Sequence, residues 1–159
     1  MRESESELSG IFRAAPVGIG VVSDRVITRV NDRLCEMTGY AREELVGKDA
    51  RVLYPTDADY EFVGSEKYRQ IRERGTGTVE TRWKRKDGTI RDILLSSAPA
   101  DAARPTTDVT FTALDITERK QTQTRLQEAY DKLSANEDEL RSQYKALAAA
   151  EARARKKEH

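Results

Sequence analysis

Glycine and proline, the residues that most often interrupt helices and strands, are confined to the first two-thirds of this sequence. All nine glycines lie at or before Gly88 and all four prolines at or before Pro105, so the last 54 residues contain neither. From Glu118 onward, 18 of 42 residues are charged, and most of the others are good helix formers such as alanine, leucine and glutamine. The sequence therefore predicts one long C-terminal helix that begins near 115–117.

The preceding part mixes short β-branched segments with glycine and proline, which indicates a mixed α+β domain. Hydrophobic spacing predicts helices at 5–15, 31–39, 42–46, 50–54 and 57–74, and strands at 17–22, 25–30, 79–84, 89–97 and 108–116. Ser23-Asp24 and Asp87-Gly88 are the expected hairpin turns. Trp83 lies on an alternating strand, where we expect it to be buried in the core or at an interface.

Two helix starts can be predicted from capping residues. Asn31 is expected to cap the helix at 31–39, and Asp57 the helix at 57–74. The expected buried side of the longer helix consists of Phe62, Tyr68 and Ile71.

Composition argues against several classes of function. The chain has 28 basic and 28 acidic residues, so no net field attracts phosphates, and we expect no binding to nucleic acid or membrane. The N-terminus lacks a signal peptide and no segment is apolar enough to span a bilayer, which favours a soluble cytoplasmic location. A single cysteine, Cys35, and a single histidine, His159, leave no disulfide framework, no Cys/His zinc site and no internal catalytic pair. We therefore assign no catalytic and no metal-binding residue.

Four motifs occur in register along the chain. They read NDRLCEMTGY at 31–40, EELVGK at 43–48, RKDGT at 85–89 and DITERK at 115–120. Together they resemble the PAS (sensory box) family over about residues 8–120. The remainder, including ELRSQYKAL at 139–147, resembles the signalling helices that join PAS modules to each other or to a histidine kinase. The resemblance implies a five-stranded antiparallel sheet with helices on one face, and a sensor or relay in place of an enzyme.

The expected organisation is a polar N-terminal segment at 1–7, a PAS-like sensor domain at 8–117 and a coiled-coil signalling helix at 118–159. The first hypothesis is a non-catalytic sensor module of a two-component system that detects a small ligand or a partner and relays it through the C-terminal helix. The alternative is a ligand-free module for dimerisation or spacing between other domains. An enzyme or a nucleic-acid binder is the third hypothesis.

Departures from the family pattern bear on cofactors. The flavin-binding branch carries its reactive cysteine in the helix after the Gly-Lys motif, whereas this chain reads GKDARVL at 47–53 and places Cys35 one helix earlier. The haem-binding branch needs a histidine on the helix at 57–74, which has none. We therefore expect neither flavin nor haem, and we interpret Cys35 as a small core residue. Ala41 stands where relatives often have a hydroxyl cap.

If the module binds an unidentified small ligand, the pocket should lie between the sheet and the helices at 31–74. The candidate lining residues are Met37, Tyr40, Leu53, Tyr54, Phe62 and Trp83. A structure with no void large enough for a small organic molecule would favour the ligand-free alternative.

The resemblance associates Asp115, Ile116 and Thr117 with signal transmission. Asp115 and Glu118 have the spacing of a capping box, Thr117 is a second candidate cap, and Ile116 is expected to anchor the strand end in the core.

Leucines recur every seven residues in the C-terminal helix, at Leu126, Leu133, Leu140 and Leu147. This heptad stripe predicts a parallel homodimer whose interface also includes the N-terminal helix and the sheet. The other partners that we expect are further domains of a larger parent protein, such as a histidine kinase.

Overall fold

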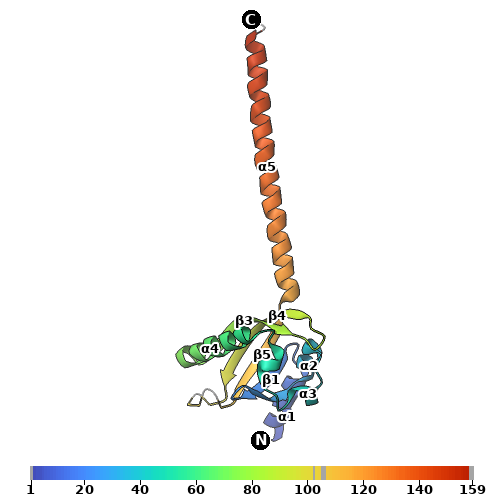
Figure 1. The fold of residues 1–159 in the computed structure, drawn as a ribbon, viewed down its shortest axis with the longest axis vertical. Coiled ribbons are helices and arrows are strands. Elements are labelled where there is room, and N and C mark those ends of the chain that lie inside the picture. The colour runs from blue at the N-terminus through green and yellow to red at the C-terminus, as the bar shows by residue number, and fades with distance from the viewer. Residues whose placement is uncertain (1, 102, 105–106, 158–159) are drawn as a thin grey trace. The chain divides into compact units, whose positions relative to one another are not determined.

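A computed structural model describes residues 2–101, 103–104 and 107–157 of the chain. Its centre is a five-stranded sheet of β1 (Gly18–Ser23), β2 (Val26–Val30), β3 (Gly77–Lys84), β4 (Ile90–Pro99) and β5 (Val109–Asp115). All neighbouring strands are antiparallel, in the order β2-β1-β5-β4-β3. Figure 1 shows the sheet with α4 beside β3. The predicted α+β class and the five-stranded antiparallel sheet are confirmed.

Three short helices and one longer helix connect the two halves of the sheet in the described residues. They are α2 (Asp32–Thr38), α3 (Arg42–Leu45), the 3₁₀ helix η1 (Ala50–Leu53) and α4 (Asp57–Arg74), and they follow α1 (Arg2–Ala14) and the β1–β2 hairpin. Helix α4 packs against β3 and β4, and α2 packs against β1. Along β3, residues alternate between buried and exposed, as a sheet covered by helices on one face requires.

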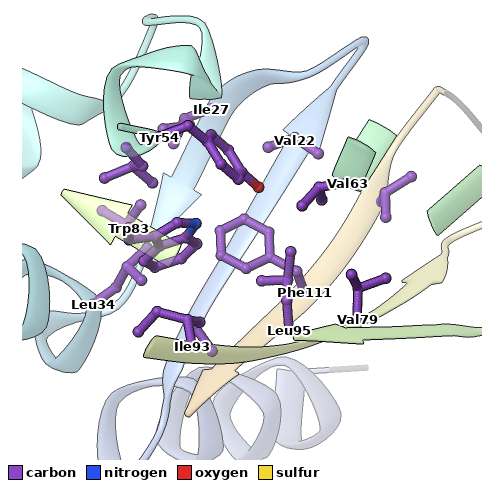
Figure 2. Close-up of a cluster of buried hydrophobic side chains, with 14 of the residues drawn as sticks. Val22, Ile27, Leu34, Tyr54, Val63, Val79, Trp83, Ile93, Leu95 and Phe111 are labelled. Carbon is purple, nitrogen blue, oxygen red and sulfur yellow. The ribbon is translucent and has the colours of Figure 1, made fainter. Parts of the chain in front are cut away.

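The core lies between this sheet face and the helices. Fully buried aliphatic side chains such as Ile27, Leu34 and Val63 surround an aromatic group (Figure 2). The Trp83 ring packs edge-on against Tyr54 and Phe111, with ring centroids 6.4 and 6.2 Å apart. Trp83 was expected in the core or at an interface, and it lies in the core.

Asn31 joins three elements through one fully buried side chain. Its Oδ1 accepts hydrogen bonds from the backbone N–H groups of Leu34, at 3.0 Å, and of Ile19, at 2.9 Å. Its Nδ2 donates to the carbonyls of Phe12 and Val17. The predicted cap of α2 is thus confirmed, and the same amide also ties α1 and β1 to it.

The β1–β2 turn differs from the sequence prediction. Ser23 pairs with Val26, so the two turn residues are Asp24 and Arg25, one position later than expected. Both have positive φ angles, 49° and 67°, which is the backbone of a tight hairpin turn. A glycine is usual at the second position, and the arginine there misled the prediction.

Two expectations for α4 were wrong. Thr56 caps the helix in place of Asp57, because its hydroxyl accepts the Asp59 N–H at 3.1 Å. Phe62 is 55% exposed, whereas the buried positions are Val63, Gly64, Lys67 and Ile71. Ile71 is buried as predicted and Tyr68 is half-buried against the core, but the inner face of α4 also includes a lysine, which a hydrophobicity pattern assigns to solvent.

Both ends of the domain are helical. Helix α1 begins at Arg2, before the expected position 5, so part of the predicted polar segment 1–7 is helical. The described residues form two compact units, one ending at Thr117 and one beginning at Glu118. The helix α5 (Thr117–Lys157) is uninterrupted. Its first residue, Thr117, belongs to the first unit, and the rest of the helix forms the second. Met1, Ala102, Pro105, Thr106, Glu158 and His159 lie outside the described residues.

Candidate functional site

A small cavity lies in the core between the sheet and the helices. Its volume is about 20 Å³. It is lined by Val22, Arg25, Ala50, Leu53, Tyr54, Lys67, Trp83, Leu95 and Phe111. Because one water molecule needs a cavity of at least about 10–15 Å³, this cavity has room for one water-sized group. Its wall is apolar except for two cationic side chains and the polar atoms of two aromatic rings.

Arg25 reaches this cavity from the β1–β2 turn. Its guanidinium carbon lies 3.5 Å from the centroid of the Tyr60 ring and 6.0 Å from that of Tyr54. Gly64 makes room for it, because a Cβ at Gly64 would come within 2.6 Å of an Arg25 Nη. The positive φ at Arg25 costs roughly 1 kcal/mol for a residue with a side chain. The backbone of the turn is therefore strained at Arg25, and in this conformation the arginine side chain lies over two aromatic rings.

Lys67 enters the cavity from α4 and is only 5% exposed. Burial, followed by the positive charge of Arg25, lowers the pKa of Lys67 from its ordinary value of 10.5 to about 8. Its ammonium nitrogen lies 4.9 Å from the centroid of the Tyr68 ring. Among the described residues, no carboxylate forms an ion pair with Lys67 or Arg25.

Two aromatic rings place polar atoms at the same site. The indole nitrogen of Trp83 is buried and lies near the Tyr54 hydroxyl, but it has no well-aligned hydrogen-bond acceptor among the described residues. Figure 2 shows this nitrogen on the ring edge that faces Phe111 and Tyr54. Burial raises the pKa of Tyr54, whereas hydrogen-bonding contributions from Trp83 and Arg25 and the positive charge of Arg25 act to lower it. The cavity thus gathers several donors and no carboxylate.

The six predicted pocket residues separate into three groups. Leu53, Tyr54 and Trp83 line the cavity. Met37 and Tyr40 are partly buried against the core but do not line it, and Phe62 lies on the exposed side of α4.

Sequence reasoning missed Arg25 and Lys67. A signal for Lys67 exists, since Val63, Lys67 and Ile71 are spaced four residues apart on one helix face. For Arg25 the signal is an arginine in a two-residue turn where glycine is favoured.

Cys35 lies outside the cavity and is partly exposed. Burial raises the pKa of its thiol, with Arg42 opposing, so the reactive thiolate is disfavoured. The site therefore contains no activated thiol, and no group of three or more potential metal ligands occurs among the described residues.

The three residues predicted to transmit a signal form a junction between β5, β4 and the start of α5. The Ile116 N–H donates to the Asp92 carbonyl at 2.8 Å, and the Asp92 N–H donates to Thr117 Oγ1 at 2.8 Å. Asp115 accepts from Arg91 Nε at 2.8 Å and from the Thr117 N–H at 3.0 Å. Burial acts to raise the pKa of Asp115, but hydrogen bonds from Thr117 and Arg91 outweigh it and lower the pKa. Ile116 is buried, as expected.

The predicted capping box of Asp115 with Glu118 is wrong, because helix α5 begins at Thr117 and Asp115 lies two residues before it. The Asp115 carboxylate accepts a hydrogen bond from the N–H of Thr117, the first residue of the helix. The Thr117 hydroxyl accepts the Asp92 N–H of β4 and does not cap the helix. Farther along α5, the four heptad leucines are each at least 59% exposed in the single chain.

Comparison with known proteins identifies the family. The PAS domain family matches residues 16–118. This chain belongs to the PAS domain family. Over 124 residues it is 36% identical to the sensor protein TdiS of Thauera aromatica, a match that covers 77% of this chain and 22% of TdiS. The chain thus spans about a fifth of the length of that curated relative.

Solved structures share the fold. The PAS domain of a LuxR-family transcriptional regulator from Burkholderia thailandensis, solved in complex with ethanol, is 27% identical with a TM-score of 0.64, covering 68% of this chain and 96% of that one. A LOV protein of Rhodobacter sphaeroides is 18% identical with a TM-score of 0.58, covering 73% and 68% respectively. The chain is a PAS sensory domain followed by a long helix. None of the helices described is both long and apolar enough to cross a bilayer.

Proposed function

We propose that this PAS domain is a non-catalytic regulatory module of a larger sensor protein, and that it controls its output through the direction or rotation of α5. The observation that carries the proposal is the junction. Only Ile116 separates the last strand from the helix, and Ile116 and Thr117 are both hydrogen-bonded to Asp92 of β4. Because no flexible linker intervenes, a shift of β4 relative to β5 would be passed to the first turn of α5.

The parent that we propose is a dimeric two-component sensor, such as a histidine kinase, that works in the cytoplasm. The similarity of this chain to about a fifth of TdiS supports a parent with several domains. The heptad leucines of α5 support pairing of two chains, and the exposed Leu8 and Ile11 of α1 offer further apolar surface for the same dimer.

We also propose that the domain holds neither flavin nor haem. Cys35 lies on α2, away from the cavity, and no histidine lies within the described residues. A purified preparation should therefore show no visible absorbance, and a stoichiometric flavin or haem spectrum would contradict this.

A second candidate function is a ligand-free relay or spacer. The specific observation in its favour is the cavity volume of about 20 Å³, which is far below the several hundred Å³ of typical pockets for drug-sized ligands. The core as it stands admits a small ion or a water molecule, and a larger ligand would require side chains to move.

Helical phase tests the relay. In the parent protein, deletion of residues 127–130 rotates everything downstream by about 40°, whereas deletion of 127–133 changes the phase by only about 20° and keeps the heptad register. We expect the four-residue deletion to lock or abolish output and the seven-residue deletion to preserve its regulation. Equal, intact output from both deletions would show that α5 is a passive tether.

A further inference from the structure

We propose that the core cavity bounded by Arg25, Lys67 and Trp83 binds a small monovalent anion, of the size of chloride or formate. The inference deepens the proposed function, on which it rests for its regulatory meaning, by naming the chemical class of the ligand. The binding itself is a property of the domain.

The first argument is charge. Lys67 is 5% exposed and Arg25 is half-buried beside it, and both line the cavity. A buried cation is costly unless an opposite charge compensates it. On its outer side Arg25 shares a surface groove with Glu61 and Arg72, but no ion pair links Arg25 to Glu61. The part of the chain that the structure describes thus leaves two adjacent cations without a carboxylate.

The second argument is hydrogen bonding. The Trp83 indole N–H can only donate, its residue is 3% exposed, and its nitrogen has no well-aligned acceptor, although the Tyr54 hydroxyl lies near it. The Arg25 Nε is buried and unsatisfied in the same way. Buried donors are nearly always paired in folded proteins. Donors from β3 and from the β1–β2 turn therefore await an acceptor, which an anion supplies together with the missing charge.

The third argument is size. A cavity of about 20 Å³ holds one water-sized group, so a halide ion matches it best, a one-carbon carboxylate requires a small shift of the lining side chains, and a larger metabolite requires a larger rearrangement. Such an ion would touch three elements, namely the β1–β2 turn through Arg25, α4 through Lys67 and β3 through Trp83. Since β3 is paired along its length with β4, binding would act on the strand that carries the junction.

Trp83 is the only tryptophan of the chain, so its fluorescence reports directly on the cavity. We would titrate sodium chloride or sodium formate into the full chain, with sodium gluconate holding the ionic strength constant. We expect a saturable change in Trp83 emission. A response to both ions indicates a general small-anion site, and a response to formate alone indicates a carboxylate site; both support the proposal.

Matched variants connect the signal to the two cations. Lys67→Met should weaken the apparent affinity by about tenfold or more, because a charge-assisted contact is lost. Lys67→Arg should largely restore it. Lys84→Met, which removes the same charge from an exposed position on the strand of Trp83, should bind as the natural chain does. Arg25→Gly should also lose binding while keeping its fold, because glycine adopts the positive φ of the turn without strain.

The proposal is overturned if neither ion gives a saturable change, or if Lys67→Met and Arg25→Gly bind as tightly as the natural chain. In that case the cavity holds solvent only. Anion binding together with equal output from the two α5 deletions would instead refute the relay and leave the anion site standing.

Discussion

At the scale of single residues, Lys67 brings burial and charge into direct conflict. Its side chain occupies a core-facing position of α4, and burial together with Arg25 lowers its pKa to about 8. Below that pH, folding must bury a charged ammonium. Between about pH 8 and 10.5 the folded state loses this proton while the unfolded chain keeps it, so stability rises with pH across that window.

Replacing Lys67 should therefore stabilise the fold. We expect Lys67→Met to raise the free energy of unfolding at pH 7 by about 1–3 kcal/mol, below the ceiling set by about 1.36 kcal/mol per unit of pKa shift. The variant should also lose the rise in stability that the natural chain shows from about pH 8 to 10. Urea unfolding at several pH values, in buffer free of chloride and formate, measures both effects.

The control for this prediction is Lys84→Met, at an exposed position, which should change stability by less than about 0.5 kcal/mol and keep the pH dependence. The pH range must end near 10, because burial and a hydrogen bond to Asp49 raise the pKa of Tyr60 to about 12, and this tyrosine lowers stability at higher pH. A natural chain and a Lys67→Met variant with the same pH profile would contradict the assignment.

Residues also show how far the sequence can be interpreted. The preference of asparagine for helix N-termini identified Asn31 as the cap of α2, because capping is a local property. Its bonds to Ile19, Phe12 and Val17 depend on how distant segments meet, which the local sequence does not encode. The site residues divide in the same way. The aromatic Tyr54 and Trp83 were predicted to line the pocket, whereas the charged Arg25 and Lys67 were missed.

At the scale of elements, periodicity predicts what burial on one face enforces. Strand β3 alternates strictly, and the turn lies at Asp87-Gly88 as predicted, although it closes between Arg85 and Thr89 and only Gly88 of the pair has a positive φ. Helix α4 is the opposite case, because a lysine on its inner face and an exposed Phe62 obscure the pattern. The residue that α4 contributes to the cavity, Lys67, therefore lies where the hydrophobic pattern of this helix is weakest.

The junction between β5 and α5 leads to a prediction at this scale. Thr117→Val keeps the shape of the side chain but removes the Oγ1 that accepts the Asp92 N–H at 2.8 Å. A fully buried N–H left without a partner costs about 1–3 kcal/mol, and because Asp92 is half-buried we expect a loss of stability of about 1 kcal/mol. Hydrogen exchange of the Asp92 amide should become faster at the same time.

Thr124→Val is the matched control, because Thr124 lies on the exposed surface of α5. It should change the free energy of unfolding by less than about 0.5 kcal/mol and leave the Asp92 amide protected. If Thr117→Val leaves the exchange rate of that amide unchanged, the hydroxyl does not hold the junction.

At the scale of the whole molecule, the distribution of glycine and proline predicts the two-part organisation. The first unit has its own core, whereas α5 exposes its heptad leucines in the single chain. A solitary helix of about 40 residues gains no stability from packing and is marginal in water. We propose that a second copy of the chain covers this stripe, because a leucine at every seventh position matches the seam of a two-stranded coiled coil.

The dimer seam should be weak, and this weakness makes it measurable. Four residues after each leucine come Tyr130, Glu137, Tyr144 and Glu151, and three residues after come Ala129, Asn136, Gln143 and Ala150, so neither frame completes a strong coiled coil. We expect sedimentation equilibrium to show a concentration-dependent dimer for the whole chain and weaker association for a version ending at Lys120. The truncated version would retain only the contribution of α1 and the sheet.

Point variants place the seam on the leucine stripe. The pair Leu133→Asn and Leu140→Asn should weaken the dimer by at least tenfold, because two buried leucine contacts would be lost to polar groups. The pair Ser134→Asn and Arg141→Asn, one residue along and therefore turned by about 100° on the helix, should leave it unchanged. A whole chain that stays monomeric at high micromolar concentration would eliminate the dimer, and α5 would then need the rest of the parent protein to cover its apolar stripe.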